Sequence, residues 1–300
     1  MDLKSFPILY DEESREQVEK FIYEHFECED DSDEEGMICH EIKSEYVHTD
    51  VYNFNSGFID NFGRRKQLFM TYAMSDLHGR YDLYIKMLEK INFMGNDTLY
   101  ILGDFVDRGD EGLRIVLDIA ERDNVIPIMG NHDYLALTIL SCLDREIRPG
   151  ELADMRYLID SWKLDGGTAT YNEYKKLSAE DRKLALMTID SFRHYAEVRI
   201  GEREFVLCHG GIRDYSEKRP LSDYMIEDLA FYREDYSKSK FAKRGKYLIT
   251  GHTPTAAIDG AEEGKIYKTR DHIAIDCGAV FGYGLGCICL DTMEEYYVKN

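Results

Sequence analysis

Apolar and polar positions alternate along residues 67–145 in a regular order of strand, polar turn and helix. The apolar run "LFMTYAMS" precedes the helical "YDLYIKMLEKINF", and "TLYIL" precedes "EGLRIVLDIAER". A third apolar run, "NVIPIM", leads through "GNHD" into "YLALTILSCL". Strands and helices in strict alternation predict parallel strands joined by right-handed crossovers.

The second half of the chain has a different pattern. Residues 150–190 are polar and helical in character, with Leu, Met and Ile at mixed spacing, and we interpret them as a cap or insertion on one face. Strand-like runs then follow in "HYAEVRI", "REFVLCHGG", "KYLITGHTP", "HIAIDCG" and "LGCICLD". The two-residue "GE" between the first two of these runs is typical of a β-hairpin turn. We therefore expect an α/β fold in which two sheets form a sandwich flanked by helices.

Residues 1–66 lie outside this pattern, so we predict an N-terminal acidic extension at 1–66 and a catalytic domain at 67–300. An apolar stripe within residues 14–27 predicts an amphipathic helix (Val18, Phe21, Ile22, His25 and Phe26). The acidic run after it resembles half of a calcium-binding EF-hand loop, but Ile42 stands where the closing glutamate is required. A solvated loop is the alternative.

Charge and composition exclude several classes of protein. The formal net charge is −21, and residues 11–35 hold thirteen acidic residues against two basic ones. A binder of duplex nucleic acid needs a basic surface, so we expect no nucleic-acid partner. No apolar run approaches the roughly 20 residues that cross a bilayer. The first residues also lack the basic segment followed by an apolar segment that a signal peptide has. We therefore expect no membrane partner. Seven cysteines without a short-spaced framework indicate reduced thiols in the cytoplasm.

Polar clusters flanked by glycine follow five of the predicted strands. Parallel strands gather their ligands beyond their C-terminal ends, and glycine lets the backbone approach a ligand closely. The clusters are "SDLHG" with Asp76 and His78, "GDFVDRG" with Asp104, Asp107 and Arg108, "GNHD" with Asn131, His132 and Asp133, "HGG" with His209, and "GHTP" with His252.

Oxygen and imidazole donors without a thiolate suit manganese, iron or zinc in a reactive site rather than a structural zinc cage. The five clusters offer too many donors for one tetrahedral ion. We therefore expect two divalent metal ions, manganese first with iron or zinc as alternatives, and Asp104 as the carboxylate that bridges them.

The ordered set "SDLHG…GDFVDRG…GNHD…HGG…GHTP" resembles the phosphoprotein-phosphatase branch of the metallophosphoesterases. This family includes eukaryotic Ser/Thr phosphatases and the lambda-phage protein phosphatase, and the resemblance covers roughly residues 67–295. It implies a metallophosphoesterase-like sandwich. It also implies the following site residues: Asp76, His78 and Asp104 on the first metal; Asp104, Asn131, His209 and His252 on the second; Arg108, Asn131 and Arg233 on the substrate phosphate; and His132, steadied by Asp107, as the acid.

The resemblance implies a phosphomonoesterase that acts on phosphoserine or phosphothreonine in proteins, and on phosphotyrosine as an extension. A metal-bound hydroxide would attack phosphorus directly. The motifs depart from the family pattern at Ser75, where glycine is usual, and at Asp133, where glutamate is commoner. "GNHD" also occurs in symmetrical diadenosine tetraphosphate hydrolases, which are the alternative. A third possible function is that of a catalytically inactive binding module. Such proteins lose metal ligands, whereas every expected ligand is present in this sequence.

Overall fold

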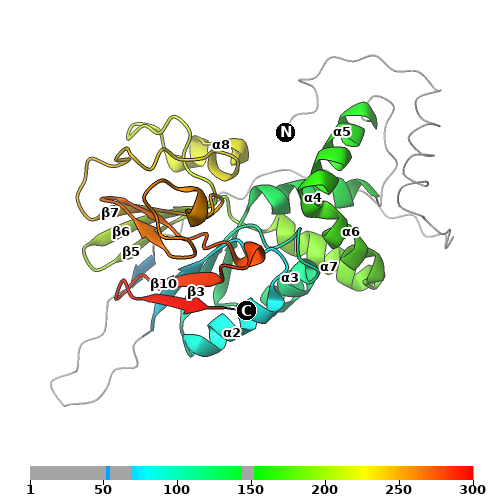
Figure 1. Cartoon of the computed structure of the whole chain (residues 1–300), viewed down its shortest axis with the longest axis horizontal. Coiled ribbons are helices and arrows are strands. Elements are labelled where there is room, and N and C mark those ends of the chain that lie inside the picture. The colour runs from blue at the N-terminus through cyan, green and yellow to red at the C-terminus, as the bar shows by residue number, and fades with distance from the viewer. Residues whose placement is uncertain (1–51, 55–68, 144–151, 300) are drawn as a thin grey trace.

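The computed structural model describes residues 52–54, 69–143 and 152–299 (Figure 1). The first sheet has the order β11-β10-β2-β3-β4. Its parallel strands are β2 (Thr71–Met74), β3 (Thr98–Leu102) and β4 (Val125–Ile128). Strands β10 (Leu285–Cys289) and β11 (Glu295–Val298) extend the sheet in antiparallel fashion. The predicted strand–helix alternation is therefore confirmed.

The second sheet has the order β1-β5-β6-β7-β9-β8. Strands β5 (Tyr195–Ile200) and β6 (Arg203–Cys208) form the predicted hairpin, and β6, β7 (Lys246–Thr250) and β9 (His272–Ala274) run parallel. Strand β8 (Tyr267–Lys268) closes one edge.

At the other edge of this sheet, β1 (Tyr52–Phe54) pairs in parallel with β5. These three residues belong to the segment that we assigned to the N-terminal extension. The predicted helix at 14–27 and the acidic run after it lie outside the described residues.

Successive side chains of a strand point to opposite faces of its sheet, and they form three apolar layers. In β3, Leu99 and Ile101 face the helices, whereas Tyr100 and Leu102 lie between the two sheets. In β6, Phe205 points between the sheets, whereas the next residue, Val206, faces the layer that α8 covers. A period of two is the geometry of a strand that is buried on both faces. The chain therefore folds as the predicted α/β sandwich of two sheets flanked by helices.

The helices are α2 (Tyr81–Lys90), α3 (Gly112–Ala120), α4 (Asn131–Leu143), α5 (Leu152–Trp162), α6 (Thr168–Lys176), α7 (Ala179–Asp190) and α8 (Ile226–Ala230). A π-helical turn, η2 (Lys163–Gly167), joins α5 to α6. Short 3₁₀ turns lie at η3 (Leu221–Asp223), η4 (Thr255–Ala257) and η5 (Ala279–Phe281). Helices α2 to α7 lie on the side of the first sheet, and α8 covers the second sheet (Figure 1).

The five described cysteines are all buried and free (Cys142, Cys208, Cys277, Cys287 and Cys289). Cys287 and Cys289 point from β10 toward the helices, while Ile288 between them faces the second sheet, so they share one face as expected. None of the helices in the described part of the chain has both the length and the apolar character that a bilayer crossing needs.

Candidate metal centre

The C-terminal ends of five strands meet at one edge of the sandwich. The first sheet contributes the loops after β2, β3 and β4, and the second sheet contributes the loops after β6 and β7. Every predicted cluster is thereby brought to the same place, and most of the side chains are buried: Asp76, His78, Asp104, Asp107, Asn131, His132 and His209.

The backbone is strained at this edge. Of the nine residues other than glycine with positive φ in the described part of the chain, six belong to the predicted site: Asp76, His78, Asp104, Asp107, Arg108 and His252. Such conformations cost free energy and persist where the surrounding structure holds them, which is common at functional sites. Gly130 shows why glycine flanks these clusters, since a Cβ there would lie 2.2 Å from Asp104 Oδ1.

Asp104 stands at the centre of the cluster. Its Oδ2 lies 3.5 Å from His78 Nε2 and 3.3 Å from His209 Nε2. The Nδ1 atoms of both imidazoles face backbone carbonyls, at 2.8 Å from Val106 O and 2.6 Å from Leu102 O. Each ring therefore presents Nε2 toward Asp104. Backbone carbonyls hold metal-ligating histidines in this way.

The environment of His209 favours a cation. Its Nε2 lies 3.0 Å from Asn131 Oδ1 and close to Asp104, so both ring nitrogens face acceptors. Although burial opposes the charge, the Asp104 carboxylate raises the pKa of His209 to about 10. His209 in turn holds the pKa of Asp104 well below its usual range, against the effect of burial. The same acceptors suit a divalent cation in place of that proton, so the donor set fits a metal.

His252 and Asp76 complete this side of the centre. The ligand atoms of Asp104, His209 and His252 lie within 4.8 Å of one another. The His252 backbone N–H donates to both oxygens of Asp76, at 3.1 and 3.0 Å. Burial lowers the pKa of His252 to about 3, so its ring is neutral and can ligate a metal. Burial also raises the pKa of Asp76 to about 6.

On the other side, His78, Asp104 and His132 form a second group of the same tightness. Burial lowers the pKa of His78 to about 3, which leaves its Nε2 available as a ligand. His132 differs from His78 because its Nδ1 faces a carboxylate, 2.7 Å from Asp107 Oδ2, rather than a carbonyl. Burial opposes protonation of His132, but Asp104 and Asp107 together raise its pKa.

Arg108 lies across the mouth of the centre. Its Nη1 donates to His78 Nε2 at 2.7 Å, and its Nη2 lies 3.0 Å from His132 Nε2. The exposed ring of Phe281 is 5.6 Å from the guanidinium carbon. Arg233 lies in the loop between α8 and β7, and its Nη1 donates to His252 O at 2.9 Å and to Thr253 Oγ1 at 3.0 Å. The structure thus brings both predicted arginines to the site.

The sequence patterns missed two residues that support Asp107. Trp162 Nε1 donates to Asp107 Oδ2 at 2.8 Å, and Thr170 Oγ1 donates to Asp107 Oδ1 at 2.6 Å. Both come from the helical cap, which we interpreted only as a covering layer. The only hint in the sequence was that Trp162, the single tryptophan of the chain, lies shortly before the pair Gly166 and Gly167.

Asp133 was named in the third cluster but given no role, and Asp165 was not predicted from the sequence. Asp133 accepts backbone N–H groups of Gly130, Asp104 and Phe105 at 2.8–3.0 Å and so holds the metal-site loops together. Burial and the neighbouring Asp104 raise its pKa to about 7. Asp165 Oδ1 accepts a hydrogen bond from Arg108 Nη2 at 2.8 Å.

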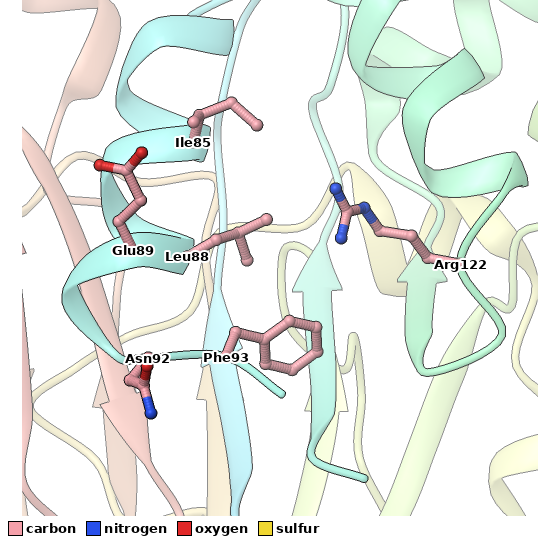
Figure 2. Close-up of a pocket in the computed structure, with 6 residues that line it drawn as sticks. All are labelled: Ile85, Leu88, Glu89, Asn92, Phe93 and Arg122. Carbon is pink, nitrogen blue, oxygen red and sulfur yellow. The ribbon is translucent and has the colours of Figure 1, made fainter. Parts of the chain in front are cut away.

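A separate cavity of about 260 Å³ lies between α2 and the end of α3 (Figure 2). It is lined by Ile85, Leu88, Glu89, Asn92, Phe93 and Arg122. Arg122 donates to Asp118 at 2.6 and 3.1 Å, so its charge is already paired. The cavity contains none of the predicted site residues.

Comparison with known proteins identifies the family of the chain. Residues 70–280 match the family described as calcineurin-like phosphoesterase. A symmetrical bis(5'-nucleosyl)-tetraphosphatase of Escherichia coli is 38% identical over 77 residues, which is 25% of this chain. The matched stretch spans only 28% of that relative's length.

A solved structure shares the fold of this chain. A protein assigned provisionally as a diadenosine tetraphosphatase superposes with a TM-score of 0.53 and 15% identity, over 83% of this chain and 99% of its own. A cold-active protein-tyrosine phosphatase from a Shewanella species gives a TM-score of 0.44 and 15% identity over 83% of each chain.

Proposed function

Since the chain belongs to the calcineurin-like phosphoesterase family, it is a metal-dependent hydrolase, and we propose that it is a phosphoprotein phosphatase with two divalent metal ions. Its substrates are phosphoserine and phosphothreonine in proteins, with phosphotyrosine as an extension. The observation that supports this most strongly is the position of Asp104 between His78 and His209, with Arg108 and His132 at the mouth. The proposal places the enzyme in the cytoplasm, with no nucleic-acid or membrane partner.

The proposed ligand sets are those that the resemblance to the family implies. In support, the structure groups Asp104 with His78 on one side and with His209 and His252 on the other. The first ion is held by Asp76, His78 and Asp104, and the second by Asp104, Asn131, His209 and His252. Manganese is the first candidate, because oxygen and imidazole donors without thiolate suit it. Two such ions supply an acidified water as nucleophile and neutralise charge on the phosphate.

The residues at the mouth handle the phosphate and the leaving group. Arg108 presents a planar guanidinium that can donate to two phosphate oxygens at once. Asn131 supplies a further donor from α4, and Arg233 supplies one from the loop after α8. His132 holds a proton on Nε2 while Asp107 accepts from Nδ1. As the bond from phosphorus to the leaving oxygen breaks, the Nε2 proton passes to that oxygen, which is the step that a serine or threonine alkoxide requires.

A dinucleoside polyphosphate hydrolase is the second candidate. It is favoured by the 38% identity to the Escherichia coli tetraphosphatase. The same metal centre could cleave a phosphoanhydride, whose leaving group is a stable phosphate that needs less protonation.

Parallel assays distinguish these two functions. The manganese-loaded full chain is given a phosphoserine peptide, a phosphotyrosine peptide and diadenosine tetraphosphate, with His132→Ala as the control for background hydrolysis. The proposal predicts a higher kcat/KM for the phosphoserine peptide. Preference for diadenosine tetraphosphate by tenfold or more would instead establish the second candidate.

A further inference from the structure

Asp165 lies on the π-helical turn η2, where it faces the two groups at the mouth of the metal centre. Its Oδ1 is 2.8 Å from Arg108 Nη2, and its Oδ2 is 3.4 Å from His132 Nε2. One carboxylate therefore spans the guanidinium and the imidazole. In the proposed function these same groups contact the phosphate and the leaving oxygen of the substrate.

The backbone holds Asp165 at this position. Gly166 has φ of 103°, and its carbonyl accepts the backbone N–H of Arg108 at 3.1 Å. A Cβ on residue 166 would lie 2.6 Å from Arg108 Cγ, so the close approach depends on glycine. The turn and the Arg108 loop are thus joined directly, which keeps the Asp165 carboxylate within reach of the guanidinium.

The side chain of Asp165 can still leave Arg108. It is 56% exposed, whereas the Arg108 side chain is 26% exposed. An ion pair of this exposure contributes little to stability. A phosphate dianion, which carries more charge than a carboxylate, can therefore displace Asp165 from the guanidinium.

We propose that Asp165 is a specificity-determining residue of the phosphate site. Its carboxylate competes with the substrate phosphate for Arg108. After displacement it lies beside the bound phosphate as a second negative charge, which a lysine or arginine next to the phosphorylated residue neutralises. The site therefore selects phosphopeptides with basic flanking residues and disfavours those with acidic ones. This inference rests on the proposed phosphatase function.

The test compares Asp165→Asn with the wild type and with Asp160→Asn. Asp160 is an exposed residue of α5, so its substitution removes the same charge from the cap without contact to Arg108. Each manganese-loaded protein is assayed with two phosphoserine peptides that differ only in lysine or glutamate flanks. Inorganic phosphate is measured separately, both as a competitive inhibitor and by calorimetric binding.

Competition predicts that Asp165→Asn lowers the KM for the glutamate peptide and the Kd for phosphate by about two- to fivefold, the range of an exposed ion pair. The preference for the lysine peptide over the glutamate peptide shrinks by a similar factor. Asp160→Asn leaves the KM, the Kd for phosphate and this preference unchanged. Unchanged affinities in Asp165→Asn would overturn the proposal.

Weaker phosphate binding by Asp165→Asn would also overturn it, because Asp165 would then only position Arg108. If the wild type hydrolyses neither peptide, the proposed function fails. The calorimetric comparison of phosphate binding still tests the competition in that case.

Discussion

The Nδ1 of His132 lies 2.7 Å from Oδ2 of Asp107, and both side chains are buried. Asp107 also accepts hydrogen bonds from Trp162 and Thr170, so its two oxygens are held from three directions. His132 is thereby fixed with its Nε2 directed toward Arg108 at the mouth of the centre. This pair can hold a proton where a leaving group needs one.

The first prediction concerns pH. Asp104 and Asp107 raise the pKa of His132 against the effect of burial, and the acid works only when protonated. In the wild type, kcat should therefore fall as pH rises through a value above the ordinary 6.5 of histidine. Asp107→Asn removes one of these carboxylates, so the alkaline limb should move to lower pH. A profile of kcat against pH checks this, and an unchanged limb would contradict it.

The second prediction separates acid from ligand. His132→Ala should lower kcat for a phosphoserine peptide by about 10²–10⁴-fold, because serine is a poor leaving group. The loss should be smaller for p-nitrophenyl phosphate, whose leaving group needs little protonation. The variant should keep its metal content. Equal losses for both substrates, or loss of a metal ion, would argue against the acid role.

The sequence predicted the strand-end residues because their signal is local. Asp76, Asp104 and His252 each follow an apolar run, and the cluster of each contains a glycine, so the pattern alone placed them at strand ends. Which residues of the cap reach the site was not predictable, because Trp162 and Asp165 arrive through tertiary packing that no nearby pattern encodes.

Two features of the fold show the same difference between local patterns and contacts between distant segments. The Gly201–Glu202 turn has a local hairpin signal, and the hairpin was predicted correctly. The pairing of β1 with β5 joins segments more than 140 residues apart in sequence. Pairings between distant segments depend on the assembled sheet rather than on local propensity.

The third prediction concerns the approach of η2 to Arg108. Gly166→Ala should raise the KM for phosphosubstrates, because the new Cβ meets Arg108 at 2.6 Å. Gly260→Ala is the matched control, since Gly260 has φ of 84° and open space around its Cα. Both variants should lose about 1 kcal/mol or more of stability from the positive φ. Steady-state kinetics should show a raised KM in Gly166→Ala only. Equal KM values in the two variants would contradict a role for the approach of Gly166 to Arg108.

The fourth prediction concerns the indole that supports Asp107. Trp162→Phe removes the donor to Asp107 from a fully buried position. Asp107 Oδ2 keeps His132 Nδ1 as a partner, but the loss of a hydrogen bond to a charged acceptor should lower the free energy of unfolding by about 1–3 kcal/mol. The value of kcat should fall as well. Leu164→Ala, at a side chain that is 90% exposed, should change the free energy of unfolding little. Denaturant unfolding checks both, and equal stabilities of the two variants would contradict the supporting role.

The metal content of Asp104→Asn tests the central claim most directly. After stripping and reloading with manganese, the wild type should bind two ions per chain by elemental analysis and recover its phosphatase activity. Asp104→Asn should bind fewer than one ion and lose that activity, because the bridging carboxylate serves both ions. Asp123→Asn, an exposed control, should match the wild type. Two ions retained in Asp104→Asn, or full turnover by the stripped wild type, would contradict a dinuclear centre bridged by Asp104.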